Sequence, residues 1–214
     1  MAEAVLQRRS AFDSLVLDEW SRGADGASSL RIARREGLAL ANVIARRGQA
    51  SALLVRVKDR FGFDLPNGPL CARNVDIAAI GTAPGAWLIV AEAATENFID
   101  DLTRTLDGAA AVIDQSGAYQ VLRLSGPALR DILAKGVPLD FHPEAFGLGA
   151  AAVTLADHVN IILWRVDSGE ALSLDIAVPR SVFGDFWSWL TESAAAYGLA
   201  LDDAPSAIAQ GEMG

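Results

Sequence analysis

The residues that could carry chemistry are few and lie far apart in this sequence. The two histidines, His142 and His158, are sixteen residues apart, and neither has a cysteine or carboxylate at the spacing of a zinc or di-iron site. His142 precedes Pro143 in a predicted loop, and His158 falls at the tip of a predicted hairpin. Because both positions suit hydrogen-bonding turn residues, the sequence predicts neither a metal site nor a histidine base.

One glycine-rich segment, residues 147–152, superficially resembles a dinucleotide-binding fingerprint. That fingerprint requires a strand before it and a helix after it, so that pyrophosphate meets a helix N-terminus. Here no strand precedes, and the following Val153, Thr154 and Leu155 are typical of a strand. The segment 81–85 lacks the Lys-Ser/Thr pair of a phosphate loop, and no Gly-x-Ser-x-Gly motif occurs. We therefore expect neither nucleotide binding nor nucleophilic catalysis.

Two pairs of neighbouring aspartates are the remaining candidates for acid–base chemistry. Residues i and i+1 do not share one face of a helix, so Asp100 and Asp101 do not converge. Asp202 and Asp203 fall in a predicted C-terminal tail. Neither pair has the arrangement of a catalytic dyad, and we expect no catalytic residue in this chain.

The last predicted helix carries two tryptophans on different sides. Trp187 lies on the apolar stripe of the helix, which leaves Trp189 nearer the surface. Two interpretations of Trp189 remain open: it contacts a partner protein, or a neighbouring loop of its own chain partly covers it.

The elements that position these residues repeat one pattern. A strand, a turn, a helix with a one-sided apolar stripe and a glycine stop follow one another three times. The three units are Trp87–Ala91 with a helix up to Gly108, Tyr119–Leu124 with a helix up to Gly136, and Ala171–Val178 with a helix up to Gly198. Thr95 and Ser181 suit helix N-caps, and Pro127 suits a first helical position.

Further predicted strands precede or separate these units, so that most strands are hairpin neighbours. Hairpins favour antiparallel pairing. We therefore predict an α+β fold of mainly antiparallel sheets, with split β-α-β units covered by helices, rather than a doubly wound parallel sheet. The additional strands are 30–35, 38–45, 75–80, 110–113, 151–155 and 159–166, and a helix with Leu53, Leu54, Val57 and Phe61 on one face follows Gly48.

The chain of 214 residues is long enough for one substantial core or two small lobes. We predict a flexible N-terminal tail over residues 1–29 and a disordered acidic tail over 201–214. Between them, residues 30–200 form a single α+β domain, with two closely packed lobes as the alternative. Apolar residues make up 51% of the sequence and charged residues 21%, a balance typical of a globular protein.

Composition also bounds location and partners. No apolar run approaches the roughly 20 residues that cross a bilayer, and Cys71 has no second cysteine with which to form an intramolecular disulfide, so we expect a cytoplasmic protein that does not bind membranes. Residues 1–73 hold 12 Lys/Arg against 8 Asp/Glu, whereas residues 74–214 hold 6 against 19. An acidic chain repels phosphate backbones, which disfavours nucleic-acid binding. The basic N-terminal part either meets a complementary partner or is solvated surface.

A set of short motifs between Leu38 and Leu199, about three quarters of the chain, resembles one protein family. Ala83 is a departure, because the family usually has glycine before Pro84-Gly85. The motifs are residues 45–48, 65–66, 83–88, 124–127, 133–136, 139–143 with Phe146, 163–165, and 178–181 followed by the tryptophan-rich helix. Together they resemble the gamma subunit family of heterotetrameric sarcosine oxidase, which is related in fold to the folate-binding aminomethyltransferase (T-protein) of glycine cleavage.

The resemblance implies that this chain carries out no catalytic step itself. In that family the gamma chain assembles with alpha, beta and delta subunits, which hold FAD, FMN, NAD and zinc. The complex oxidatively demethylates sarcosine to glycine and passes the one-carbon unit to tetrahydrofolate. The resemblance therefore implies no redox cofactor in this chain and a role in supporting the complex.

The fold kinship leaves a second function open, a free-standing folate-binding or aminomethyltransferase-like protein. Folate-binding relatives grip the pterin with a carboxylate, and no single Asp or Glu of this sequence matches that position. For the subunit interpretation, the candidates for partner contact are Trp189, Arg165 and Arg180. The two arginines are among only six basic residues after position 73, and they either meet a partner or brace the C-terminal half internally.

Overall fold

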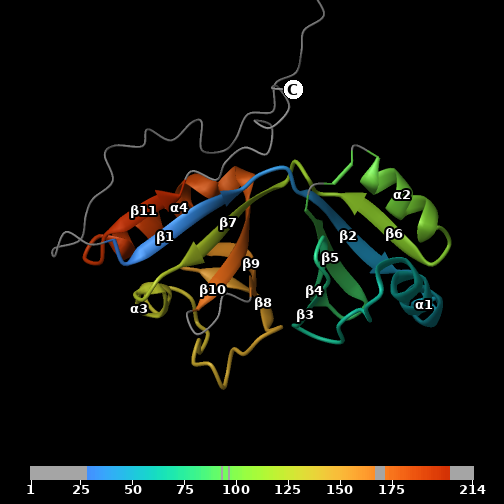
Figure 1. Ribbon diagram of the computed structural model, residues 1–214, viewed down its shortest axis with the longest axis horizontal. Helices are drawn as coiled ribbons and strands as arrows, with labels where there is room; N and C mark the ends of the chain where they lie inside the picture. Colours follow the sequence, from blue (N-terminus) through green and yellow to red (C-terminus); the bar gives the residue numbers. More distant parts are fainter. Residues whose placement is uncertain (1–27, 93, 96, 167–171, 203–214) are drawn as a thin grey trace, which may run out of the picture.

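The protein is built from two β-sheets that lie face to face, with helices on their outer faces (Figure 1). The computed structural model describes residues 28–92, 94–95, 97–166 and 172–202. The six-stranded sheet has the order β11-β1-β7-β10-β9-β8, and the five-stranded sheet has the order β3-β4-β5-β2-β6.

The strands of each sheet come from different parts of the chain. The six-stranded sheet contains β1 (Leu30–Arg35), β7 (Tyr119–Ser125), β8 (Ala151–Ala156), β9 (Val159–Arg165), β10 (Ser173–Pro179) and β11 (Leu199–Asp202). The five-stranded sheet contains β2 (Ala39–Ala45), β3 (Cys71–Arg73), β4 (Ile77–Ala83), β5 (Ala86–Ala91) and β6 (Ala110–Asp114).

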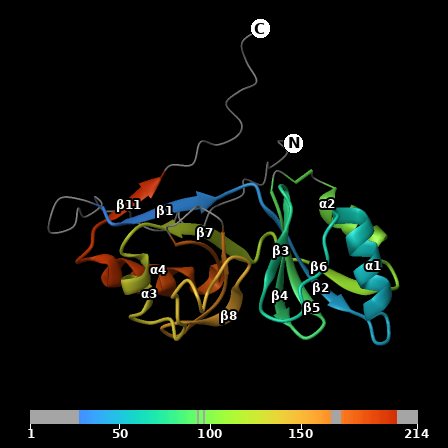
Figure 2. The same ribbon diagram turned by 60° about the horizontal axis from the view of Figure 1, so that its bottom comes forward.

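The helices complete an outer layer on each side (Figure 2). Helices α1 (Ala50–Phe61) and α2 (Phe98–Thr105) cover the five-stranded sheet. Helices α3 (Leu129–Leu133) and α4 (Phe183–Ala194) cover the six-stranded sheet, and a 3₁₀ turn (Arg180–Val182) leads into α4. None of the described helices is both long and apolar enough to cross a membrane.

Both faces of the central strands are buried, because a third core fills the space between the two sheets. Successive side chains of a strand point to opposite faces, so a strand packed on both sides reads as a continuous apolar run. The inter-sheet core takes Leu40, Leu88 and Ile80 from one sheet and Val121 and Trp164 from the other. This core holds the two sheets as one body.

The α+β class and the mainly antiparallel pairing are confirmed. The predicted units appear as β5-α2, β7-α3 and β10-α4. Strands β5 and β6 both pair antiparallel with β2 and are therefore parallel to each other, with β2 between them. Likewise β10 and β11 are parallel and are separated by β7 and β1. These are the split β-α-β units that the sequence predicts.

Some local predictions are wrong. The N-cap positions are Asn97 and Val182 rather than Thr95 and Ser181, and neither cap residue makes a side-chain cap hydrogen bond. Leu54 is 39% exposed, whereas the other three residues of the predicted α1 face are buried. Helix packing against the sheet, rather than capping chemistry, therefore sets where these helices begin.

The C-terminal boundary also differs from the prediction. Leu201 and Asp202, assigned to a tail, pair with Ile32 and Ala33 in the parallel strand β11. The parts of the predicted tails at 1–27 and 203–214 lie outside the described residues. This parallel edge strand has only four residues and follows a helix. Because no hairpin turn connects it to its partner strand, the sequence contains no local signal that predicts it.

A buried carboxylate joins strands of the two sheets through arginine side chains. Asp175 of β10 is 4% exposed and accepts two hydrogen bonds from Arg123 of β7, at 2.7 Å from Nε and 2.8 Å from Nη2. Arg35, the last residue of β1, lies with Nε 3.9 Å from Asp175 and forms a 2.7 Å ion pair with Glu92, directly after β5. This Asp175 cluster therefore connects three strands of the six-stranded sheet to the five-stranded sheet.

The opposite charges of Arg123 and Asp175 stabilise each other. The hydrogen bond to Asp175 is the largest cause that raises the pKa of Arg123, and it outweighs the opposite effect of burial. Arg123 and Asp175 are direct cross-strand neighbours in the pairing of β7 with β10. Their side chains therefore meet without displacing either strand.

We predict that Asp175→Asn lowers the free energy of unfolding by about 3 kcal/mol, because it keeps the shape of the side chain but removes the charge that partners Arg123. Urea unfolding followed by circular dichroism measures this change. Asp64→Asn is the control, since Asp64 forms an ion pair with Lys58 at 3.0 Å between side chains that are 70% and 60% exposed. It should cost less than about 1 kcal/mol, and equal losses in the two variants would contradict the role given to Asp175.

Candidate functional site

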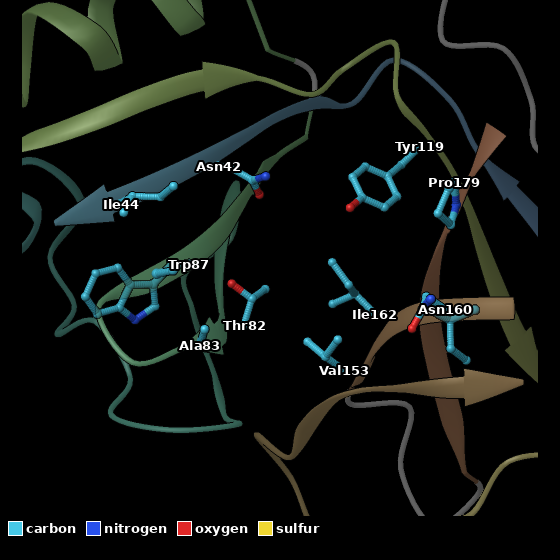
Figure 3. A pocket seen from close by; sticks show the side chains of 12 residues that line it. Asn42, Ile44, Thr82, Ala83, Trp87, Tyr119, Val153, Asn160, Ile162 and Pro179 are labelled. Carbon is cyan, nitrogen blue, oxygen red and sulfur yellow. The ribbon is translucent and has the colours of Figure 1, made fainter. Parts of the chain in front are cut away.

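A groove opens between the two sheets beyond the inter-sheet core, with a cavity volume of about 330 Å³ (Figure 3). The strands that form the inter-sheet core also line this groove, with residues further along each strand. On β2 the inward-facing Leu40 belongs to the core, and the next inward-facing residue, Asn42, lines the groove. The same step of two residues leads from Ile80 to Thr82 on β4 and from Val121 to Tyr119 on β7, as the alternation of a strand requires.

The lining of the groove is apolar with a few polar groups. Asn42 and Thr82 project from one wall and Tyr119 and Asn160 from the other, toward the space between them (Figure 3). The lining residues are Asn42, Ile44, Thr82, Ala83, Ala86, Trp87, Tyr119, Val153, Asn160, Ile161, Ile162 and Pro179. None of these side chains is charged. The groove is therefore suited to bind a neutral or weakly polar group through apolar contact and a few hydrogen bonds.

One wall of the groove is fixed by a tryptophan. Trp87 of β5 is 8% exposed, and its indole Nε1 donates a 2.8 Å hydrogen bond to the carbonyl oxygen of Pro66. This bond satisfies the one polar atom of the buried ring. It also ties the loop after α1 to the five-stranded sheet.

Trp189 is half-buried and is held by its own chain. Its ring packs 5.7 Å from the ring of Phe186. Gly136, after α3, lies directly against it, because a Cβ atom added there would be 2.5 Å from the indole Nε1. Coverage by a loop of its own chain, the second of the two sequence interpretations, therefore describes most of this residue. Partner contact through its exposed part stays a prediction.

The two candidate arginines occupy different environments. Arg165 is 9% exposed, and its guanidinium donates a 2.6 Å hydrogen bond to the carbonyl oxygen of Phe146. It thus braces the loop before β8, which is the internal role of the two proposed for it. Arg180 begins the 3₁₀ turn before α4, is half-buried, and its backbone amide donates to the carbonyl oxygen of Ala118. The structure does not bring Arg165, Arg180 and Trp189 together into one site.

The histidines lie where the sequence predicts. His142 is in the loop after α3, and His158 lies at the exposed tip of the β8–β9 hairpin, 2.6 Å from the Asp157 carboxylate. The glycine-rich segment 147–152 leads into the strand β8 rather than a helix. No group of three or more potential metal ligands occurs among the described residues.

The single cysteine is shielded. Burial is the main cause that raises the pKa of the Cys71 thiol to about 11, while Arg73 lowers it and Asp175 raises it. The thiol is therefore protonated at neutral pH, and a protonated thiol is a poor nucleophile and a poor metal ligand.

The sequence does not predict the groove, and it gives only an indirect indication of the Asp175 cluster. The groove draws its residues from seven strands, and no local sequence pattern predicts such an arrangement. The cluster did leave a signal, because Asp175 interrupts an apolar strand and Arg123 interrupts another. A charge within a fully buried strand requires a partner of opposite charge.

Comparisons with a family model and with individual relatives identify the same protein family. Residues 46–196 match the model of the sarcosine oxidase gamma subunit family. A sarcosine oxidase subunit gamma from Arthrobacter sp. is 31% identical over 165 residues, which cover 77% of this chain and 68% of that protein. Its counterpart from Corynebacterium sp. (strain P-1) is 28% identical over 144 residues, covering 66% of this chain and 71% of that protein.

Two solved structures have similar folds. A chain of the heterotetrameric sarcosine oxidase from Corynebacterium sp. U-96, in complex with pyrrole 2-carboxylate, aligns with a TM-score of 0.74 and 26% identity over 89% of this chain and 96% of that chain. The glycine cleavage aminomethyltransferase T from Bartonella henselae aligns with a TM-score of 0.60 and 13% identity over 81% of this chain and 48% of that chain. The second likeness shows the fold alone.

We predict that Gly136→Ala destabilises the protein by about 1–3 kcal/mol, because the new methyl group would collide with the Trp189 indole. Thermal unfolding measures this loss. The double variant Gly136→Ala/Trp189→Leu should recover part of it, since the smaller side chain makes room for the methyl group.

Gly184→Ala is the matched control, because a Cβ atom at Gly184 in α4 has no atom within 4 Å. It should leave stability unchanged or raise it by up to about 1 kcal/mol. An unchanged melting temperature in Gly136→Ala would contradict the close packing of Trp189.

Proposed function

Because the chain belongs to the sarcosine oxidase gamma subunit family, we propose that it is a subunit of a heterotetrameric sarcosine oxidase. In this proposal it assembles with alpha, beta and delta subunits that carry FAD, FMN, NAD, zinc and tetrahydrofolate. Its own contribution is to hold the complex together while that complex demethylates sarcosine. The catalytic residues belong to the partners.

The observation that carries this proposal is the extent of the structural match. The described fold aligns with 96% of a chain from a solved heterotetrameric sarcosine oxidase. The overall fold is therefore shared with a chain of that assembly, which supports the same setting for this one. A shared fold does not by itself fix a function, so the family match over residues 46–196 is the second support for the proposal.

The chemistry of the groove supports a binding role. Its lining holds no carboxylate, imidazole, amine or thiol, so it offers no general acid or base with a pKa near neutrality. What it offers is apolar surface with Asn42, Thr82, Tyr119 and Asn160 placed to accept or donate hydrogen bonds. Such a surface suits recognition rather than proton transfer.

We predict that the tagged chain, expressed with the other three subunits of its own organism, purifies with them in a fixed equimolar ratio. The complex should absorb as a flavoprotein and produce peroxide when sarcosine is added. Gel densitometry, visible absorbance and a peroxide assay measure the three properties. A chain that purifies alone and colourless, while the other subunits form an active oxidase without it, would contradict the proposal.

The groove is also the observation that favours a second candidate function, the binding of a small molecule such as folate. A cavity of about 330 Å³ is within the range of small-molecule sites, and it lies between the sheets of a fold shared with an aminomethyltransferase. A free-standing folate-binding protein is therefore the alternative. The lining opposes it, because it includes neither Asp nor Glu to grip the ring nitrogens of a pterin.

We predict that tetrahydrofolate produces no binding heat with the isolated chain, since the groove lacks that carboxylate. Isothermal titration calorimetry measures this directly. Saturable heat that disappears in Asn42→Ala and persists in Asn67→Ala, a change outside the lining, would favour the folate-binding alternative.

A further inference from the structure

Exposed apolar side chains gather around the groove. Of the nine large apolar residues that are exposed among the described residues, two line the groove, three lie on β8 or next to its start, and one lies opposite a lining residue on the neighbouring strand. They are Ile44 (43% exposed), Leu70 (47%), Ile113 (46%), Leu148 (66%), Val153 (50%) and Leu155 (40%). Such a concentration on one part of a surface marks an interaction site more often than a random scatter does.

The pairing of these residues explains why they share one region. Ile44 and Val153 both line the groove, from β2 and β8 respectively. Ile113 of β6 lies directly opposite Asn42, another lining residue, in the pairing of β2 with β6. Leu155 is two residues after Val153 on β8 and therefore lies on the same face of the strand.

Strand β8 also presents an open edge. It is the last strand of the six-stranded sheet in the part of the chain that the structure describes. Its first residues show which backbone groups point outward: the amide of Ala151 donates to Pro69, and the carbonyl of Gly149 accepts from Cys71. The orientation repeats every two residues, so the N–H and C=O groups of Val153 and Leu155 also point away from β9.

This edge lacks the features that keep exposed strands from pairing. Residues 151–156 read Ala-Ala-Val-Thr-Leu-Ala, without charge or proline. All six pair in continuous register with β9, so no bulge interrupts the strand. Natural proteins protect or cover such edges. The segment around Leu70 already forms an antiparallel bridge with Ala150, and the edge beyond Ala151 continues in the same geometry.

We propose that the outer edge of β8 and the adjoining groove bind an extended, apolar segment of another subunit. That segment adds a strand next to Val153 and Leu155 and places alternate apolar side chains in the groove. This inference rests on the proposed function, because it names the surface through which the chain joins its partners.

Charge favours a different chain over a second copy of this one. The groove lining carries no charged residue, so a charged segment would lose its hydration there without compensation. A second copy would bring another chain of net charge −9 to the same face, and most of that charge lies in residues 74–214, which include β8. An uncharged segment from a partner of different composition avoids both costs.

The test is Val153→Lys in the co-expressed complex, with Val55→Lys as the matched control. The two valines are 50% and 58% exposed, but Val55 lies on α1, on the outer side of the five-stranded sheet. We expect Val153→Lys to weaken co-purification with the partner subunits roughly tenfold or more, as at a central interface position. Val55→Lys should leave it at the wild-type level. Thermal unfolding of each isolated variant checks that both fold.

The outcomes separate this inference from the function on which it rests. If wild type, Val55→Lys and Val153→Lys all co-purify equally, the β8 docking surface is wrong while the subunit function stands. If the wild-type chain binds no partner, both are wrong. If the wild-type chain sediments as a dimer that Val153→Lys dissociates, the occupant is a second copy, and the proposal of a different chain is overturned.

Hydrogen exchange tests the edge without any substitution. In the isolated full-length chain the outward-facing amides of Val153 and Leu155 should exchange rapidly, whereas in the complex they should be protected at least tenfold. The amide of Thr154, which points toward β9, should be protected in both. Protection of Val153 and Leu155 in the isolated monomer would show that the chain covers its own edge and would overturn the proposal.

Discussion

The arrangement of the two sheets depends on one buried carboxylate. Asp175 lies on the inter-sheet face of β10, and its two oxygens receive the guanidinium of Arg123 and approach that of Arg35. Arg35 in turn reaches Glu92 at the end of β5. A buried carboxylate without its partner is costly, so Asp175 requires the guanidinium of Arg123 beside it.

The groove exists because the sheets diverge away from this junction. Near Asp175 the inward-facing side chains of both sheets meet and form a closed core. Two residues beyond the core residues Leu40, Ile80 and Val121, the inward-facing side chains line the groove, where the neutral polar Asn42, Thr82, Tyr119 and Asn160 stand among apolar residues. The chain thus presents an apolar cleft and an unprotected strand edge side by side. A protein that acts alone is expected to cover both, whereas a subunit leaves them for its neighbours.

Much of the fold could be predicted from the sequence, because its signals are local. Alternation and turn residues located the hairpins, and the apolar stripes located α1, α2 and α4 with small errors at their ends. Strand β3, of three residues, and β11, which pairs with the distant β1, gave no comparable signal. The groove could not be predicted, because it is assembled from seven strands whose relative placement depends on long-range packing. Trp189 was a plausible surface residue by helical position, but the missing side chain of Gly136 allows the α3 loop to cover it.

In the proposed assembly, this chain joins its partners through the β8 edge and the inter-sheet groove. A cryo-electron microscopy map of the complex purified from its own organism tests this most directly. We expect an extended segment of a different subunit hydrogen-bonded to Val153 and Leu155, with side chains in the groove between β8 and β2. A map in which that edge faces solvent and the groove is filled only by water would contradict it.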